Sequence, residues 1–137
     1  GWTPKSLASK IEAGADFVQT QFCMDGAVLR RYLARLAAEG LTERLHILIG
    51  VCPIPSARSA RWMKEKLFGT VIADAIVERL EKAADPKAEG IKLCAEFMQE
   101  LATIPGVAGA HVMAPQNISA IPEVIALSGV AGKPRAR

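Results

Sequence analysis

Short apolar runs alternate with helical segments along this chain, and no two of the runs are close enough in sequence to form a hairpin. Strands that are separated by helices pair in parallel, and a parallel sheet needs helices to cover its faces. The sequence therefore predicts an α/β fold with the element order αβαβααβα. Strands are expected at residues 16–22, 46–51 and 107–113, and helices at residues 3–13, 25–39 and 117–127. Residues 57–102 are expected to be helical throughout, with breaks at Gly69 and at Asp85-Pro86.

Capping residues set the expected helix boundaries. The first helix begins with the capping hydroxyl of Thr3 followed by Pro4, and Gly14 ends it. Asp25 and Asn117 are expected to cap the second helix and the last one. The second helix repeats leucines on one face, which should pack on the sheet; these are Leu29, Leu33 and Leu36.

Three strands make a poor parallel sheet on their own, because both edges stay exposed. The pattern thus predicts an incomplete α/β sheet. The sequence contains no internal repeat and no linker, so residues 1–137 are expected to form part of a single domain.

Composition excludes several classes of function. Half of the residues are hydrophobic and 23% are charged, which is enough for a real core and argues against disorder. The net charge is only +3 and aromatic residues make up 5%, so nucleic-acid binding is not expected. No apolar stretch approaches the roughly 20 residues that span a bilayer. Three cysteines without Cys-x-x-Cys spacing indicate reduced thiols in a cytoplasmic protein, and no complete set of zinc ligands is visible.

Parallel α/β folds bind ligands at the carboxyl ends of their strands. The first strand ends in Thr20-Gln21-Phe22, and the amide of Gln21 suits the polar edge of a heterocycle. The second strand leads into a proline-rich loop that is followed by Arg58, which suits a carboxylate or a phosphate. No pair of carboxylates, Ser/His/Asp set or glycine-rich phosphate loop is present. These residues predict a small-molecule site rather than a complete catalytic centre.

Three blocks of the sequence resemble the methylenetetrahydrofolate reductase family. Lys10 to Phe22 resembles the family stretch K-x-x-A-G-A-[DN]-x-x-x-T-Q-x. Gly50 to Ile54 is similar to its P-G-I-x-P-[IV] loop, with Ile49 in place of the first proline. Gly109 to Asn117 resembles its last strand, G-x-H-F-Y-T-x-N, with one extra residue. The resemblance implies the C-terminal portion of a (β/α)₈ TIM barrel, with strands 6, 7 and 8 and their helices.

The family resemblance also implies an activity and roles for three residues. The reaction is the reduction of 5,10-methylenetetrahydrofolate to 5-methyltetrahydrofolate, with FAD passing hydride from NAD(P)H. Gln21 matches a residue that contacts the folate, with Thr20 beside it, and Lys10 matches a residue that contacts FAD. Arg58 is expected to be a third substrate contact on its own chemistry, since a guanidinium suits a carboxylate or a phosphate. The family's catalytic residues belong to earlier strands, so no catalytic residue is expected here and the fragment alone is expected to be inactive.

Departures from the family pattern keep two alternatives open. Thr3, Ser6 and Ser9 stand where the family usually has an aspartate, an asparagine and an arginine facing FAD, and Ala57 replaces an aromatic lid. A flavin-independent relative is therefore one alternative. The other is a non-catalytic half-barrel or companion subunit, which needs either a second copy or the remainder of a barrel to cover its sheet.

Several residues have a purely structural interpretation as well. Gln21 could satisfy backbone groups at a strand end, and Arg58 could pair with a helix carboxylate. His111 is expected to be an interior histidine held by hydrogen bonds, while Trp62, Met63 and Met98 are expected to be packing residues. Cys23 and Cys52 follow adjacent strands and could approach each other.

Overall fold

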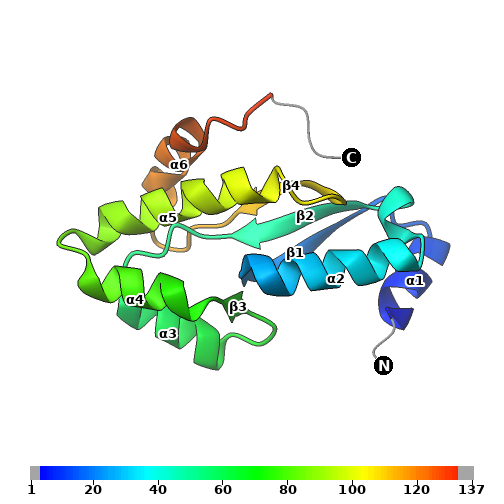
Figure 1. Cartoon of the computed structure of the whole chain (residues 1–137), viewed down its shortest axis with the longest axis horizontal. Helices are drawn as coiled ribbons and strands as arrows, with labels where there is room; N and C mark the ends of the chain where they lie inside the picture. The colour runs from blue at the N-terminus through cyan, green and yellow to red at the C-terminus, as the bar shows by residue number, and fades with distance from the viewer. Residues whose placement is uncertain (1–3, 133–137) are drawn as a thin grey trace.

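The computed structural model describes residues 4–132 and contains one four-stranded parallel sheet (Figure 1). The strand order is β3-β1-β2-β4, and every pairing in it is parallel. The strands are β1 (Phe17–Met24), β2 (His46–Val51), β3 (Val71–Ile72) and β4 (Val107–Val112). The α-helices are α1 (Lys5–Glu12), α2 (Gly26–Ala38), α3 (Ala57–Lys66), α4 (Asp74–Lys82), α5 (Pro86–Leu101) and α6 (Ile121–Ser128). Two 3₁₀ turns, η1 (Leu41–Glu43) and η2 (Ile118–Ala120), complete the order.

The predicted α/β fold with parallel strands is confirmed. β1, β2 and β4 are neighbours in chain order, as consecutive strands of a (β/α)₈ barrel are, and a helix follows each of them. The sheet is therefore consistent with part of such a barrel.

The prediction that residues 57–102 are wholly helical is wrong. Between α3 and α4 the chain turns at Gly69, whose φ is +81°, and forms the two-residue strand β3. Val71 and Ile72 pair with Cys23 and Met24 at the end of β1, so tertiary pairing decides the conformation of this segment. The sheet consequently has four strands where three were expected.

Most of the predicted helix boundaries are confirmed. Gly14 follows α1 with a φ of +107°, and Gly129 follows α6 with a φ of +63°. The carboxylate of Asp25 accepts hydrogen bonds from the backbone N–H groups of Ala27 and Val28, as a helix cap should. Asn117 is different, because it precedes η2 and makes no capping bond with its side chain. The predicted cap at Thr3 lies outside the described residues.

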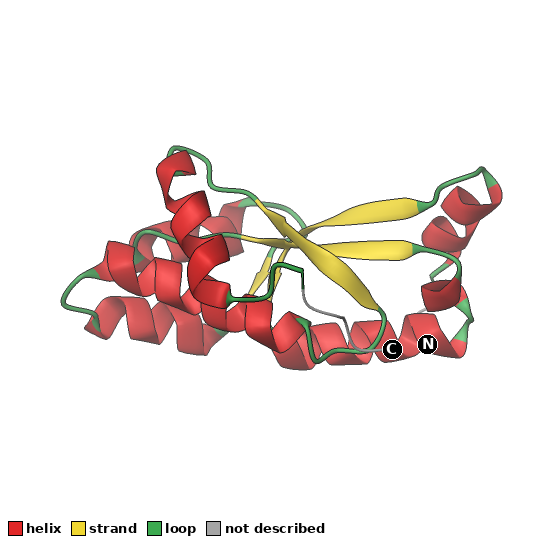
Figure 2. Ribbon diagram, turned by 90° about the horizontal axis from the view of Figure 1, so that it is seen from above, coloured by secondary structure: helices red, strands yellow, loops and turns green. Residues whose placement is uncertain are grey.

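The core lies between the sheet and the helices that cover one of its sides. The long helices run along that side in Figure 2. The β2 side chains of Ile47, Ile49 and Val51 are fully buried there, and the three α2 leucines predicted to pack on the sheet are at most 2% exposed. Phe17 of β1 is 60% exposed, so the other side of the sheet is largely uncovered.

Candidate functional site at the carboxyl ends of the strands

An extra residue in β1 shapes the site at its base. Gln19 pairs with Leu48, but Phe22 pairs with Gly50, so β1 advances three residues while β2 advances two. The Thr20 hydroxyl fills the gap in the ladder by accepting a hydrogen bond from Gly50 N at 3.0 Å and donating one to Gln21 O at 2.7 Å. A Cβ atom on Gly50 would lie 2.8 Å from Thr20 O, so only glycine fits at this position.

Gln21 lies on the exposed edge of this bulge. Its Oε1 accepts a hydrogen bond from Phe22 N at 3.0 Å, and its Nε2 donates one to Phe68 O at 3.5 Å. Gln21 therefore does bond to backbone groups near the end of the strand, which was its structural interpretation from the sequence. One Nε2 proton and one Oε1 lone pair remain for a ligand, and the side chain is exposed enough to meet one.

A cleft of about 640 Å³ opens beyond the carboxyl ends of β1, β2 and β4. Its apolar walls come from Phe22 of β1, from Cys52 and Pro55 after β2, and from Trp62 of α3. The polar part of the lining comes from three places. Arg58 and Ser59 lie in the first turn of α3, Lys87 lies in the first turn of α5, and Gln116 and Asn117 lie in the loop after β4. An apolar cleft with a few polar groups is typical of a small-molecule site.

The polar groups of the cleft differ in how they are held. Asn117 is 7% exposed, and its Nδ2 donates a hydrogen bond to Pro53 O at 3.3 Å, which ties the loop after β4 to the loop after β2. Arg58 and Lys87 are exposed, and neither forms an ion pair or a hydrogen bond with any of residues 4–132. The alternative that Arg58 pairs with a helix carboxylate is therefore wrong for this structure.

Two structural interpretations from the sequence are also wrong. Trp62 is 56% exposed and lines the cleft, so it is not a packing residue, although Met63 and Met98 are buried as expected. His111 was expected to be held by hydrogen bonds, but its Nδ1 is buried without a hydrogen-bond partner among the described residues. His111 of β4 is the ladder partner of Gly50 of β2, and Gly50 is in turn the partner of Phe22 of β1.

Lys10 and Thr20 lie in a second, smaller pocket of about 270 Å³ between α1, α2 and β1. Lys5, Ser6 and Tyr32 also line it. The four residues singled out from the sequence are thus divided: Arg58 lines the large cleft, Lys10 and Thr20 line the small pocket, and Gln21 lies at the strand edge beside Phe22.

The three cysteines are free thiols. Burial raises the pKa of Cys52 and of Cys94 to about 12, and the nearby Cys52 adds to the effect on Cys94. Burial also raises the pKa of Cys23. Cys52 thus lies close enough to Cys94 of α5 to affect the pKa of that thiol. Within residues 4–132, no three His, Cys, Asp or Glu side chains are grouped so that they could hold a metal ion.

Comparison with models of known protein families identifies the family of this chain. The family model described as methylenetetrahydrofolate reductase matches residues 2–129 of the chain. The chain belongs to the methylenetetrahydrofolate reductase family. A sequence search against curated proteins gives no match.

Membership of the methylenetetrahydrofolate reductase family indicates an oxidoreductase-like function in folate chemistry. The three sequence blocks that resemble the family end at β1, β2 and β4, which are adjacent in the sheet. The described residues include no helix that is long and apolar enough to cross a membrane.

Sequence reasoning missed Lys87 and Trp62 as residues of the site. Lys87 lies 29 positions after Arg58, and only the packing of α5 against the loop after β2 brings the two into one cleft. The sequence did offer a way to find Trp62. It lies four residues, or one helical turn, after Arg58, so both side chains are on the same face of α3.

Proposed function

We propose that this chain provides the folate-binding side of a methylenetetrahydrofolate reductase, which reduces 5,10-methylenetetrahydrofolate to 5-methyltetrahydrofolate with NAD(P)H as reductant. The observation that carries the proposal is the cleft at the carboxyl ends of three adjacent parallel strands in a chain of this family. Open α/β sheets and barrels hold their ligands at this end. Free thiols are in keeping with a cytoplasmic location.

Four side chains supply the folate contacts in this proposal. Gln21 offers an amide donor and acceptor to the polar edge of the pterin. Trp62, which is 56% exposed, offers an aromatic face to the rings, and Phe22, which is 5% exposed, contributes only the small part of its ring that lines the cleft. Arg58 meets a carboxylate, since it has no partner among the described residues. Thr20 acts by fixing the bulge that presents Gln21, and by lining the neighbouring pocket.

The proposed cofactor is FAD, and the small pocket fits one part of it. Lys5 and Lys10 carry two positive charges, and Ser6 adds a hydroxyl, which is the chemistry that holds a diphosphate. The Thr20 hydroxyl lines the pocket, but its proton is already donated to Gln21 O. When bound, FAD would supply the hydride-transfer chemistry between NAD(P)H and the folate. Lys10 would hold and orient a phosphate oxygen. The serines at positions 6 and 9, where the family usually has asparagine and arginine, favour a flavin-independent relative as the second candidate.

We assign no catalytic residue to this chain. The proton transfers of the reaction need a group supplied by other strands, either of the same polypeptide or of a second copy. One side of the sheet is uncovered, with Phe17 60% exposed, which favours a partner that supplies the missing strands. The same observation supports the alternative, a half-barrel that is inactive alone.

Replacing Gln21 by alanine tests the substrate contact. We expect Gln21→Ala to weaken binding of 5-methyltetrahydrofolate about tenfold, because one or two hydrogen bonds to the ligand are lost. Gln19→Ala is the matched control, since Gln19 is an exposed glutamine two positions earlier on β1, before the bulge. Isothermal titration calorimetry measures both affinities. Equal affinities for wild type and Gln21→Ala would remove Gln21 from the site.

A further inference from the structure

Two cations that come from different helices face the same cleft. Arg58 is the second residue of α3 and Lys87 is the second residue of α5, and both line the cavity at the carboxyl ends of the strands. None of the residues that line this cavity is acidic. Arg58 and Lys87 form no ion pair within residues 4–132, so both charges are available to a ligand in this cavity.

Close packing holds the two helix starts together. A Cβ atom on Gly90 of α5 would lie 1.9 Å from Ile54 O, so α5 touches the backbone of the loop that leads into α3. The beginnings of α3 and α5 lie at the same end of the molecule in Figure 1. Because helix starts carry partial positive charge, they add to the potential of the two side chains. Asp85, the cap of α5, offsets part of it and is engaged with Ala88 N.

We propose that Arg58 and Lys87 form a two-cation subsite for the glutamate end of the folate substrate, and that this pair determines specificity for ligands with a dianionic tail. The inference rests on the proposed function and adds Lys87 to it. A glutamate carries two carboxylates. The planar guanidinium of Arg58 binds one of them with two donors, and the ammonium of Lys87 meets the other as a point charge. Trp62, one helical turn after Arg58, offers its face to the aryl ring that precedes the glutamate.

A pair of ligands that differ only in the tail separates this subsite from the rest of the cleft. Tetrahydrofolate carries the glutamate, whereas the primary amide of tetrahydropteroate keeps the aryl amide group and has no carboxylate. We expect the full chain to bind tetrahydrofolate at least tenfold more tightly than this neutral amide. Arg58→Gln and Lys87→Gln should each weaken tetrahydrofolate binding about tenfold and leave binding of the amide unchanged, because each removes a charge-assisted contact to the tail only.

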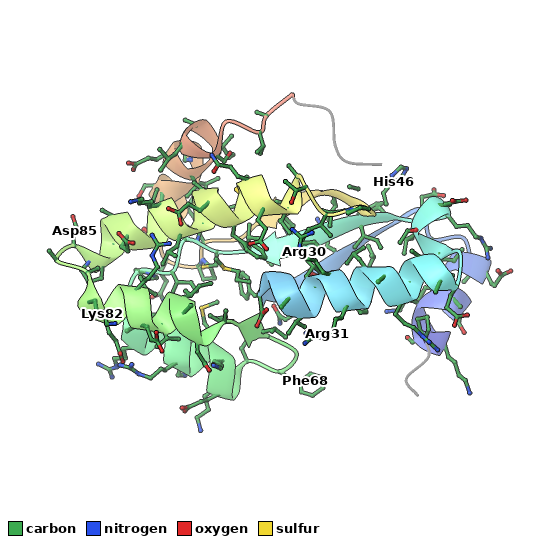
Figure 3. The ribbon with its side chains drawn as sticks, viewed as in Figure 1. Arg30, Arg31, His46, Phe68, Lys82 and Asp85 are labelled. Carbon is green, nitrogen blue, oxygen red and sulfur yellow. The ribbon has the colours of Figure 1, made fainter. Side chains whose placement is uncertain are left out.

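Arg31→Gln is the matched control for the loss of one positive charge. Arg31 is exposed on α2, as Figure 3 shows, and does not line the cleft. Its substitution should leave both affinities as in the wild type, and circular dichroism checks that every variant is folded. The subsite is overturned if wild type binds the two ligands equally, or if the cleft variants lose both ligands to the same extent. If neither ligand binds the folded wild-type chain, the proposed function fails, and the subsite loses its ligand with it.

Discussion

Cys52 and Cys94 are 4% and 0% exposed, and burial keeps both thiols protonated above the pH at which an ordinary thiol ionises. Their pKa of about 12 in the folded chain lies above the ordinary value of 9.0, which an unfolded chain should show. The folded state therefore retains protons that the unfolded state releases. This contribution to stability is complete below pH 9.0 and is lost as the pH rises toward about 12.

We predict that the free energy of unfolding falls between these pH values, with a contribution of about 1.4 kcal/mol per pH unit from each thiol. Urea unfolding at a series of pH values measures the slope. The double variant Cys52→Ala, Cys94→Ala serves as the control, because it keeps all other titrating groups. An identical pH dependence in the double variant and the wild type would show that the thiols do not contribute.

Thr20 and Gln21 show how far single residues were predictable. The sequence predicted correctly that they lie in a strand, but the predicted strand end at residue 22 is wrong, because β1 continues to Met24. Which pocket each side chain faces did not follow, since the extra residue in β1 breaks the two-residue alternation from which strand faces are read. The bulge depends on the contact between Thr20 and Gly50, which are 30 positions apart.

At the scale of elements, the contact between α5 and the loop after β2 sets the shape of the cleft. Gly90 is buried, and its neighbours at this contact are the carbonyl oxygen, carbonyl carbon and nitrogen of Ile54. Backbone cannot move aside as a side chain can. We predict that Gly90→Ala lowers the free energy of unfolding by about 1–3 kcal/mol, the usual cost of overpacking.

Gly26→Ala provides a matched comparison for that substitution. A Cβ atom on Gly26 would also meet an atom at 1.9 Å, but that atom is Oε1 of Glu100, at the end of a flexible side chain. Glu100 can rotate away, and alanine favours the helix by about 0.5–1 kcal/mol over glycine. Thermal unfolding should therefore show Gly26→Ala close to or above the wild type and Gly90→Ala well below it. Equal stability of the two variants would contradict the close approach at Ile54.

The elements themselves were predictable to different degrees. α2 and β2 carry clear periodicity and clear capping signals, and both appear where they were expected. β3 has only two residues, which is too short for any periodic pattern, and it exists because Cys23 and Met24 offer a free strand edge. Local sequence contains no information about that edge.

At the scale of the whole molecule, the sheet leaves part of one edge and most of one face uncovered, which is unusual for a parallel sheet. β3 pairs only with Cys23 and Met24, so within residues 4–132 the stretch 17–22 has no partner strand on that edge. Phe17 is 60% exposed on the sheet and Phe68 is 98% exposed on the turn before β3, where Figure 3 labels it. Parallel sheets are normally covered on both faces and paired or protected at their edges.

We therefore predict that the 137-residue chain on its own associates with a second copy through the uncovered side of the sheet. Sedimentation velocity of the 137-residue chain should give a mass above 14.6 kDa. Phe17→Lys should reduce the association, because it places a charge on the side of the sheet that the association would bury. Phe68→Lys, an equally drastic change on an exposed turn, should leave it unchanged. A folded wild-type chain that sediments at 14.6 kDa at all concentrations would contradict this prediction.

The fold class and the family followed from the sequence because alternating strands and helices admit few arrangements, and because three motifs fall in one order. The composition of the cleft did not follow, since it gathers residues from β1, α3, α5 and the loop after β4. Only the folded chain brings Lys87 into one cleft with Trp62 and Arg58.

The most direct test of folate binding in the cleft uses Trp62 as its own reporter. The chain has two tryptophans, Trp2 and Trp62, so a Trp2→Phe variant emits from the cleft alone. Titration of this variant with 5-methyltetrahydrofolate should change the Trp62 emission in a saturable manner. The affinity from this titration should match the calorimetric one. An emission that stays constant while calorimetry detects binding would place the folate elsewhere, and the absence of binding in both measurements would contradict a folate site in this chain.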